Sequence, residues 1–166
     1  MSDDPLFDTA VALVLAHEGG LHDDPRDPGG LTHWGFALRE NPDLTAAALR
    51  AMTRAEAEAR YRTRWWDRYP WRRLPRPVAL KLFDLAVPIG PANAIRALQR
   101  ACRAAGRAVA EDGKLGDATI GTAASLPPDL LLAALKSELA GHFRSIVATE
   151  PHKARFLAGW LARAYG

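Results

Sequence analysis

The segment 17–35, HEGGLHDDPRDPGGLTHWG, holds residues whose types suit acid–base chemistry. Glu18 ends an apolar run, AVALVLA, and Gly19-Gly20 follow it at once. Glycine commonly ends a helix in left-handed geometry, so this carboxyl is expected at a helix C-terminus. Apolar neighbours and the negative end of the helix dipole both disfavour an ionised carboxylate. Glu18 is therefore a candidate general acid, a carboxyl that keeps its proton until it donates it.

The loop after the glycine pair supplies carboxyl groups of the opposite kind. Asp23, Asp24 and Asp27 lie among prolines and glycines, where water would keep them ionised. One protonated and one ionised carboxyl facing a cleft is the arrangement that glycoside hydrolysis requires. Thr32, at the far end of the loop, could hold an attacking water through its hydroxyl. A glutamate near a helix end is often only a solvated end residue, so this pattern alone leaves both interpretations open.

Metal chemistry fits the same segment less well. His17 and His22 are five residues apart, whereas the zinc-protease motif needs a spacing of four. Five residues rotate the second imidazole by about 140° around a helix, and the glycine pair would break that helix. The aspartates also lack the alternating spacing and closing glutamate of an EF-hand. The sequence therefore predicts no metal site.

Hydrophobic periodicity predicts the helices that would position these residues. Val11, Val14 and Leu15 share one face of a helix over 7–18, which places Glu18 on the same stripe, with Asp8 or Thr9 as the cap. A Thr53…Glu56 capping box opens another helix over 52–66. Further helices are expected over 44–50, 78–87, 91–105, 129–148 and 152–164, with a short one after the turn at 111–119 and a short β-hairpin around 31–37. The fold class is mainly α, with at most a small β-hairpin.

Composition bounds the class of protein without choosing a function. The chain has 166 residues, 48% hydrophobic and 25% charged, which suits a folded protein with a substantial core. A net charge of +3 suits an anionic polymer, either a cell wall or a nucleic acid. The single cysteine, Cys102, excludes an intrachain disulfide. The acidic start, MSDDPLFDTA, is unlike a signal peptide and no run is long enough to span a membrane, so we expect synthesis in the cytoplasm without a signal peptide.

Arginines and aromatic residues alternate between positions 60 and 76. Seven arginines share this stretch with Tyr61, Trp65, Trp66, Tyr69 and Trp71. Grooves for single-stranded nucleic acid use this mixture, but aromatic rings also stack on sugars, and several of these rings must belong to the core. Spacing alone does not decide among the three interpretations.

Two further aspartates are expected to have structural roles. Asp84, on an otherwise apolar helix face, is expected to be a buried cap or the partner of an arginine. Asp112-Gly113, with Gly116 and Thr119, reads as a turn and a helix cap.

Beyond single motifs, the chain resembles glycoside hydrolase family 108, the EGGY-type phage lysozymes related to secretion-activator proteins. The resemblance starts at HEGGLHDDPRDPGGLTHWG and continues through ARYRTRWWDRYPWRRLP (59–75) and LFDLAVPIGPANAIRALQRA (82–101). VAEDGKLGDATIGT (109–122) and FLAGWLARA (156–164) are similar to the peptidoglycan-binding region that follows in that family. The resemblance thus spans nearly the whole chain in order.

The resemblance implies a lysozyme-like catalytic region over 1–92 and a helical peptidoglycan-binding region over 93–166. It implies a muramidase that cleaves the β-1,4 bond between N-acetylmuramic acid and N-acetylglucosamine, with Glu18 as general acid and without metal or organic cofactor. Asp27 and Thr32 fall where broader phage lysozymes have an Asp and a Thr, although Asp23 or Asp24 could serve in place of Asp27. The expected substrate contacts are Asp24, Trp34, Tyr61, Trp66 and Asp112.

The expected partner is the glycan strand of peptidoglycan, bound by a monomer, with neither nucleic acid nor stable membrane insertion. Such an enzyme would serve cell lysis or wall penetration. It would act in the periplasm or cell wall after holin-type release, or as part of a particle.

The chain departs from the family at three places, and the departures at Leu21 and Pro88 favour an alternative. Leu21 stands where the family has the Tyr of EGGY, and His33 replaces a more common Asn or Lys. Pro88-Ile89 occupies the place of an Asn-containing pair. A peptidoglycan-binding or secretion-related protein with little turnover is therefore the first alternative, and an Arg/Trp-rich nucleic-acid binder is the second.

Overall fold

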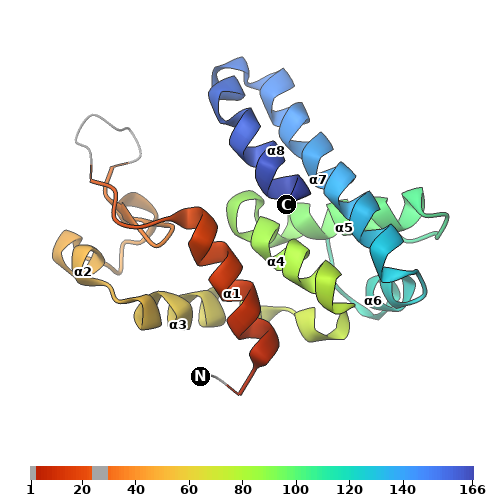
Figure 1. Ribbon diagram of the computed structural model, residues 1–166, viewed down its shortest axis with the longest axis horizontal. Coiled ribbons are helices and arrows are strands. Elements are labelled where there is room, and N and C mark those ends of the chain that lie inside the picture. The colour runs from red at the N-terminus through yellow and green to blue at the C-terminus, as the bar shows by residue number, and fades with distance from the viewer. Residues whose placement is uncertain (1–2, 24–29) are drawn as a thin grey trace. The chain divides into compact units, whose positions relative to one another are not determined.

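A computed structural model of the protein describes residues 3–23 and 30–166 (Figure 1). Helices account for most of these residues, and the β-structure among them is a two-stranded antiparallel sheet with one isolated bridge. The mainly α fold class with a small hairpin is thereby confirmed. None of the described helices combines the length and the apolar character needed to span a bilayer.

The chain divides into two compact units, residues 1–67 and 68–166. The boundary that we predicted at 92/93 concerns which segment catalyses and which binds, and it stays a prediction.

The first unit consists of short elements around one long helix. Its elements are α1 (Pro5–Glu18), β1 (Thr32–His33), β2 (Phe36–Ala37), the 3₁₀ turn η1 (Leu38–Glu40), α2 (Ala46–Ala51), α3 (Arg54–Arg64) and the 3₁₀ turn η2 (Trp66–Arg68). The predicted capping box opens α3, because Thr53 Oγ1 accepts from the Glu56 N–H (3.3 Å) and Glu56 Oε2 accepts from the Thr53 N–H (2.7 Å).

Helix α1 begins two residues earlier than we expected. The cap is Asp4, not Asp8 or Thr9, and its carboxylate accepts from the Phe7 N–H (3.2 Å). Asp4 is buried, and its second oxygen accepts from the indole N–H of Trp66 (2.7 Å). The same carboxylate therefore starts the helix and fixes the largest side chain of this core. No sequence pattern predicts this second role, because the two residues are far apart in the chain.

The second unit is a set of packed helices. Its elements are the 3₁₀ turn η3 (Trp71–Arg73), α4 (Arg76–Ile89), α5 (Pro91–Ala104), α6 (Asp117–Ala124), α7 (Pro128–Thr149), the 3₁₀ segment η4 (Pro151–Phe156) and α8 (Leu157–Tyr165). Helix α7 packs against α4, α5 and α8 (Figure 1). Its buried stripe includes Leu131, Leu135, Leu139 and Phe143, as the periodicity of the sequence predicts.

A buried ion cluster joins α8 to α4. Asp84 is 2% exposed and accepts from the Arg163 guanidinium at 2.9 and 3.1 Å. Lys81 lies 3.8 Å from the same carboxylate and donates to the Arg163 carbonyl. Burial lowers the pKa of Lys81, and the nearby Asp84 opposes that shift. The prediction that Asp84 is the buried partner of an arginine is confirmed.

Candidate functional site

Glu18 is the last residue of α1, as the glycine pair predicted. Gly19 has a φ of 74°, and its N–H donates to the Leu15 carbonyl at 3.3 Å. Val14 and Leu15 on the preceding turn are buried, whereas Glu18 itself is only half-buried. The expectation that Glu18 lies fully on the buried stripe is therefore too strong. A half-buried carboxyl can pack its methylene groups while its oxygens stay within reach of a ligand.

A tight turn between β1 and β2 lies against Glu18. The strands pair Thr32 with Ala37 and His33 with Phe36, which leaves Trp34 and Gly35 as the two turn residues. Their φ values are 52° and 82°, and positive φ at both central positions is typical of a type I′ hairpin turn. Tryptophan rarely adopts a positive φ, so surrounding contacts must hold it there.

Three hydrogen bonds from other elements hold this turn. The Trp34 indole N–H donates to the Met52 carbonyl (3.0 Å), and the Tyr61 hydroxyl donates to the Trp34 carbonyl (2.9 Å). His33 Nδ1 lies 2.9 Å from the Leu49 carbonyl, so Nδ1 carries the proton in this bond. The ring of His33 also stacks on that of Trp34, with centroids 5.1 Å apart. His33 thus anchors the turn to α2.

Gly35 approaches the candidate acid closely. A Cβ at this position would lie 2.9 Å from Glu18 Cγ and 3.1 Å from Glu18 Cβ, and it would collide with the Tyr61 hydroxyl. Only glycine allows this contact, so the backbone of the turn forms a wall beside the Glu18 side chain. Our sequence reasoning missed Gly35. The available signal was the short HWG sequence inside a predicted hairpin.

The two ends of the aspartate loop are fastened together. His22 and Thr32 exchange two backbone hydrogen bonds of 2.8 Å each. Thr32 is half-buried, and its hydroxyl donates to the Gly30 carbonyl at 3.4 Å. Asp23 forms an ion pair with Arg50 of α2, at 2.7 and 2.9 Å. Sequence reasoning did not identify Arg50.

Asp24 and Asp27 lie outside the described residues, so their assigned roles stay predictions.

The three predicted aromatic contacts occupy different environments. Trp66 is 0% exposed and Tyr61 is 1% exposed, so neither presents a ring face to a sugar. Both are core residues, which corrects their assignment as substrate contacts. Tyr61 reaches the site only through the hydroxyl that holds the turn. Trp34 is half-buried and is the predicted aromatic residue that lies in the turn beside Glu18.

Asp112 belongs to the second unit, where its carboxylate organises the loop between α5 and α6. It accepts from the Lys114 N–H (2.9 Å) and from the side-chain amide of the buried Gln99 (2.8 Å). These two bonds lower the pKa of Asp112. The Gln99 amide also accepts from the Gly113 N–H and donates to Thr119. The local role is therefore structural, and a contact with the cell wall stays a prediction.

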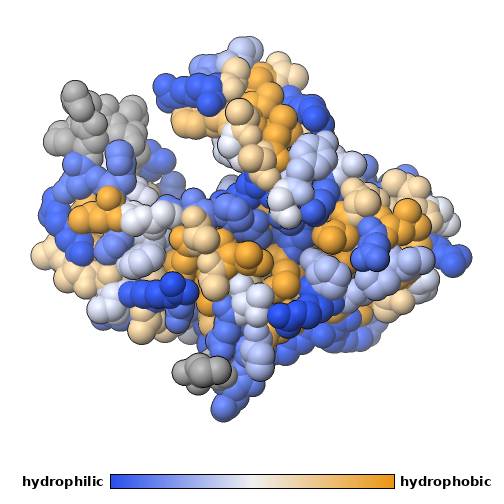
Figure 2. All heavy atoms as spheres, in the orientation of Figure 1, coloured by the Kyte–Doolittle hydropathy of each residue, from blue (hydrophilic) through white to orange (hydrophobic). Residues whose placement is uncertain are grey.

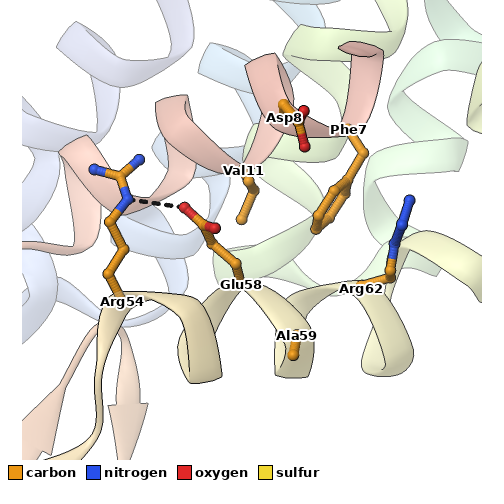
Figure 3. A pocket seen from close by; sticks show the side chains of 7 residues that line it. All are labelled: Phe7, Asp8, Val11, Arg54, Glu58, Ala59 and Arg62. Carbon is orange, nitrogen blue, oxygen red and sulfur yellow. Dashed lines mark hydrogen bonds and ion pairs between the residues drawn. The ribbon is translucent and has the colours of Figure 1, made fainter. Parts of the chain in front are cut away.

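A pocket of about 490 Å³ also lies between α1 and α3 (Figure 3). Asp8 and Glu58 contribute carboxylates to it, and Glu58 is paired with Arg54 at 2.8 Å. Asp8 precedes Glu18 by ten residues, which is about 15 Å along a helix. This pocket is therefore separate from the Glu18 turn, and its described lining contains none of the predicted site residues.

Comparison with known proteins gives two family matches along the chain. In the first unit, a carboxyl at a helix end lies beside a hairpin turn. Residues 11–90 match the family described as glycosyl hydrolase 108, and residues 93–165 match the family described as "Predicted Peptidoglycan domain". The first segment thus matches a glycosyl hydrolase 108 domain, and the second matches a predicted peptidoglycan domain.

A solved structure, that of SagA from Brucella abortus, is similar over nearly the whole chain. The TM-score is 0.72 with 26% sequence identity, covering 96% of this chain and 93% of SagA. No curated protein sequence matches this chain. The family and the peptidoglycan domain together make the protein a peptidoglycan-related glycosyl hydrolase.

Proposed function

We propose that the protein is an N-acetylmuramidase, which hydrolyses the β-1,4 bond between N-acetylmuramic acid and N-acetylglucosamine in peptidoglycan. The observation that carries this proposal is the half-buried Glu18 at the end of α1, held beside the strained Trp34–Gly35 turn. A turn kept in a rare conformation by bonds to three other residues is costly to maintain, and such strain concentrates at functional sites. Its position against the carboxyl at the helix end supports a role for that carboxyl in the chemistry.

In the proposed reaction, Glu18 donates its proton to the glycosidic oxygen as the bond to the anomeric carbon breaks. The sugar then develops positive charge, which an ionised carboxylate of the loop stabilises. Water adds to the anomeric carbon and gives its proton to one of the two carboxylates, that of the loop or the now ionised Glu18. Asp23 is the weakest candidate for that carboxylate, because Arg50 already neutralises it. We therefore assign the role to Asp27, with Asp24 as a substrate contact, and we assign Thr32 to the position of the water.

The test is clearing of purified peptidoglycan together with an assay of newly formed reducing ends. We expect Glu18→Gln to lower the rate by about 10²–10⁴-fold, the usual contribution of a general acid, while far-UV circular dichroism stays unchanged. Glu40→Gln is the matched control, since Glu40 is an exposed glutamate of the same unit that pairs with Arg39. Clearing that survives Glu18→Gln would remove Glu18 from the mechanism.

A wall-binding protein with little turnover is the second candidate, favoured by Leu21, which is 51% exposed where the family has a tyrosine. It predicts that the wild type sediments with peptidoglycan but releases no reducing ends. The same assay therefore decides between the two candidates.

The arginine- and aromatic-rich stretch 60–76 gives little support to nucleic-acid binding. Tyr61, Trp66 and Trp71 are buried. Several arginines are engaged within the protein: Arg60 binds Asp43, Arg62 lies over the Phe7 ring, Arg64 binds Asn41 and Arg73 binds Asp117. Many of the ring faces and guanidinium groups that a nucleic-acid groove needs are thus used internally.

We further propose that the enzyme acts in the periplasm or cell wall, in lysis or wall penetration, after holin-type release or as part of a particle. Lysis that requires a co-expressed holin would support the first route.

A further inference from the structure

A groove in the second unit has the features of a binding site, and Glu18 is not among the residues that line it. It lies where the corner between α4 and α5 meets α7, η4 and α8, and its volume is about 350 Å³. This volume is within the range of small-ligand sites. Pro88, Ile89 and Ile146 supply apolar walls, and Asn93, His142 and Lys153 supply polar groups. Figure 2 shows hydrophobic side chains reaching the surface over the α7–α8 hairpin.

Two aromatic residues that line this groove, Phe143 and Trp160, stack on one another, and Phe156 packs on Trp160 from outside the lining. Trp160 lies against Phe143 with ring centroids 5.2 Å apart and an interplanar angle of 25°. It also lies against Phe156, at 5.7 Å and 29°. Arg155 in turn covers the Phe156 ring at 4.7 Å. Because the faces of these rings pack on each other, the groove is poorly suited to stacking on a sugar ring and better suited to alkyl groups.

The chain segment that supplies His142, Ile146 and Lys153 to the groove carries more basic than acidic residues. The segment 142–155, which forms the end of α7 and most of η4, has Arg144, Lys153 and Arg155 against a single acid, Glu150. Lys153 is half-buried in the groove lining, and its ammonium is 2.8 Å from the Glu150 carboxylate. A carboxylate entering the groove would have to share the Lys153 ammonium with Glu150, beside apolar walls.

We propose that this groove binds the stem peptide of peptidoglycan, the short alanine-containing chain with free carboxylates that is joined to muramic acid. Its methyl groups would pack on Ile89 and Ile146, and a carboxylate would pair with Lys153. This inference rests on the proposed function only in taking peptidoglycan as the polymer. It assigns the second unit to the peptide and leaves the glycan to the first.

The test is titration calorimetry on the full-length wild type with two soluble probes. The first is a synthetic stem tetrapeptide, and the second is a tetramer of N-acetylglucosamine without peptide. We expect Lys153→Gln to weaken binding of the tetrapeptide about five-fold, as for a partly screened ion pair, and Lys153→Arg to retain most of it. Ile146→Glu, which places a carboxylate in the groove, should abolish that binding. Arg103→Gln is the control, since Arg103 is an exposed cation paired with Glu111 on the same unit, outside the groove lining.

Three results would overturn the proposal. The first is that the wild type does not bind the tetrapeptide. The second is that Lys153→Gln and Ile146→Glu both bind the tetrapeptide as tightly as the wild type does. The third is that these variants lose binding of the sugar tetramer and keep binding of the tetrapeptide. The muramidase proposal is tested separately, by incubating the wild type with peptide-free glycan. That proposal fails if no reducing ends are released. A protein that binds the tetrapeptide yet releases none would retain the groove and lose only the enzyme activity.

Discussion

At the scale of single residues, the Glu18 site depends on a glycine that carries no functional group. Gly35 has a φ of 82°, and a Cβ at this position would lie 2.9 Å from Glu18 Cγ. Gly35→Ala must therefore move the turn or displace the carboxyl. Because a misplacement of about 1 Å can cost about 10²-fold in rate, we expect that loss in release of reducing ends. The variant should also lose about 1–3 kcal/mol of stability from backbone strain.

Gly20→Ala is the matched control for this prediction. Gly20 is two residues from Glu18, but no heavy atom of the described residues lies within 4 Å of the position that its Cβ would take. Rates of Gly35→Ala and Gly20→Ala that agree within about two-fold would show that the turn does not position Glu18.

At the scale of elements, the N-terminus of α3 couples the helix to pH. The Thr53 N–H and hydroxyl both donate to Glu56 and lower the pKa of its carboxyl from 4.5, the value without these bonds. A carboxyl whose pKa is lower in the folded state stabilises the fold above its unfolded pKa, and that stabilisation is lost as the pH falls through the folded value. We expect Thr53→Ala to destabilise the protein by about 1 kcal/mol at pH 7. Thermal unfolding should show only part of this difference shrinking below pH 4.5, because alanine keeps the backbone N–H that bonds Glu56 and the lost bond from the Glu56 N–H to the Thr53 hydroxyl does not titrate. A difference that stays constant down to about pH 3 would rule out Glu56 as its source.

The elements also show how far sequence can go. Signals within a few residues, such as the Thr53…Glu56 box and the glycines after Glu18, predicted helix ends that the structure confirms. Contacts between distant segments left no such signal. The Asp4–Trp66 bond joins residues 62 apart and decides that Trp66 is core. The Tyr61–Trp34 bond likewise makes Tyr61 a support for the turn and not a sugar contact.

At the scale of the whole molecule, each compact unit is closed by a buried aspartate bound to a residue far along the chain. Asp4 and Trp66 close the first unit, and Asp84 and Arg163 close the second. The second closure consists of charged groups in the interior, where removing one partner leaves the other uncompensated. We expect Arg163→Met to cost about 3 kcal/mol, the lower end of the usual range, because Lys81 remains 3.8 Å from Asp84. Urea unfolding followed by circular dichroism would measure this loss.

A double variant tests whether ionic or apolar contacts stabilise the packing of α8 on α4. In Asp84→Leu/Arg163→Met two of the three charges are absent and apolar side chains of similar size can fill the interior, but Lys81 loses its carboxylate partner and keeps only its bond to the carbonyl of residue 163. Only part of the lost stability should therefore return. Methionine takes the place of the alkyl part of Arg163 in both the single and the double variant. The packing contribution of this side chain is therefore equal in the two. If the double variant is less stable than Arg163→Met alone, the ion cluster contributes net stability, and α8 is held to α4 by charge more than by apolar contact. Recovery would show that the cluster specifies where α8 docks while the apolar core supplies the free energy.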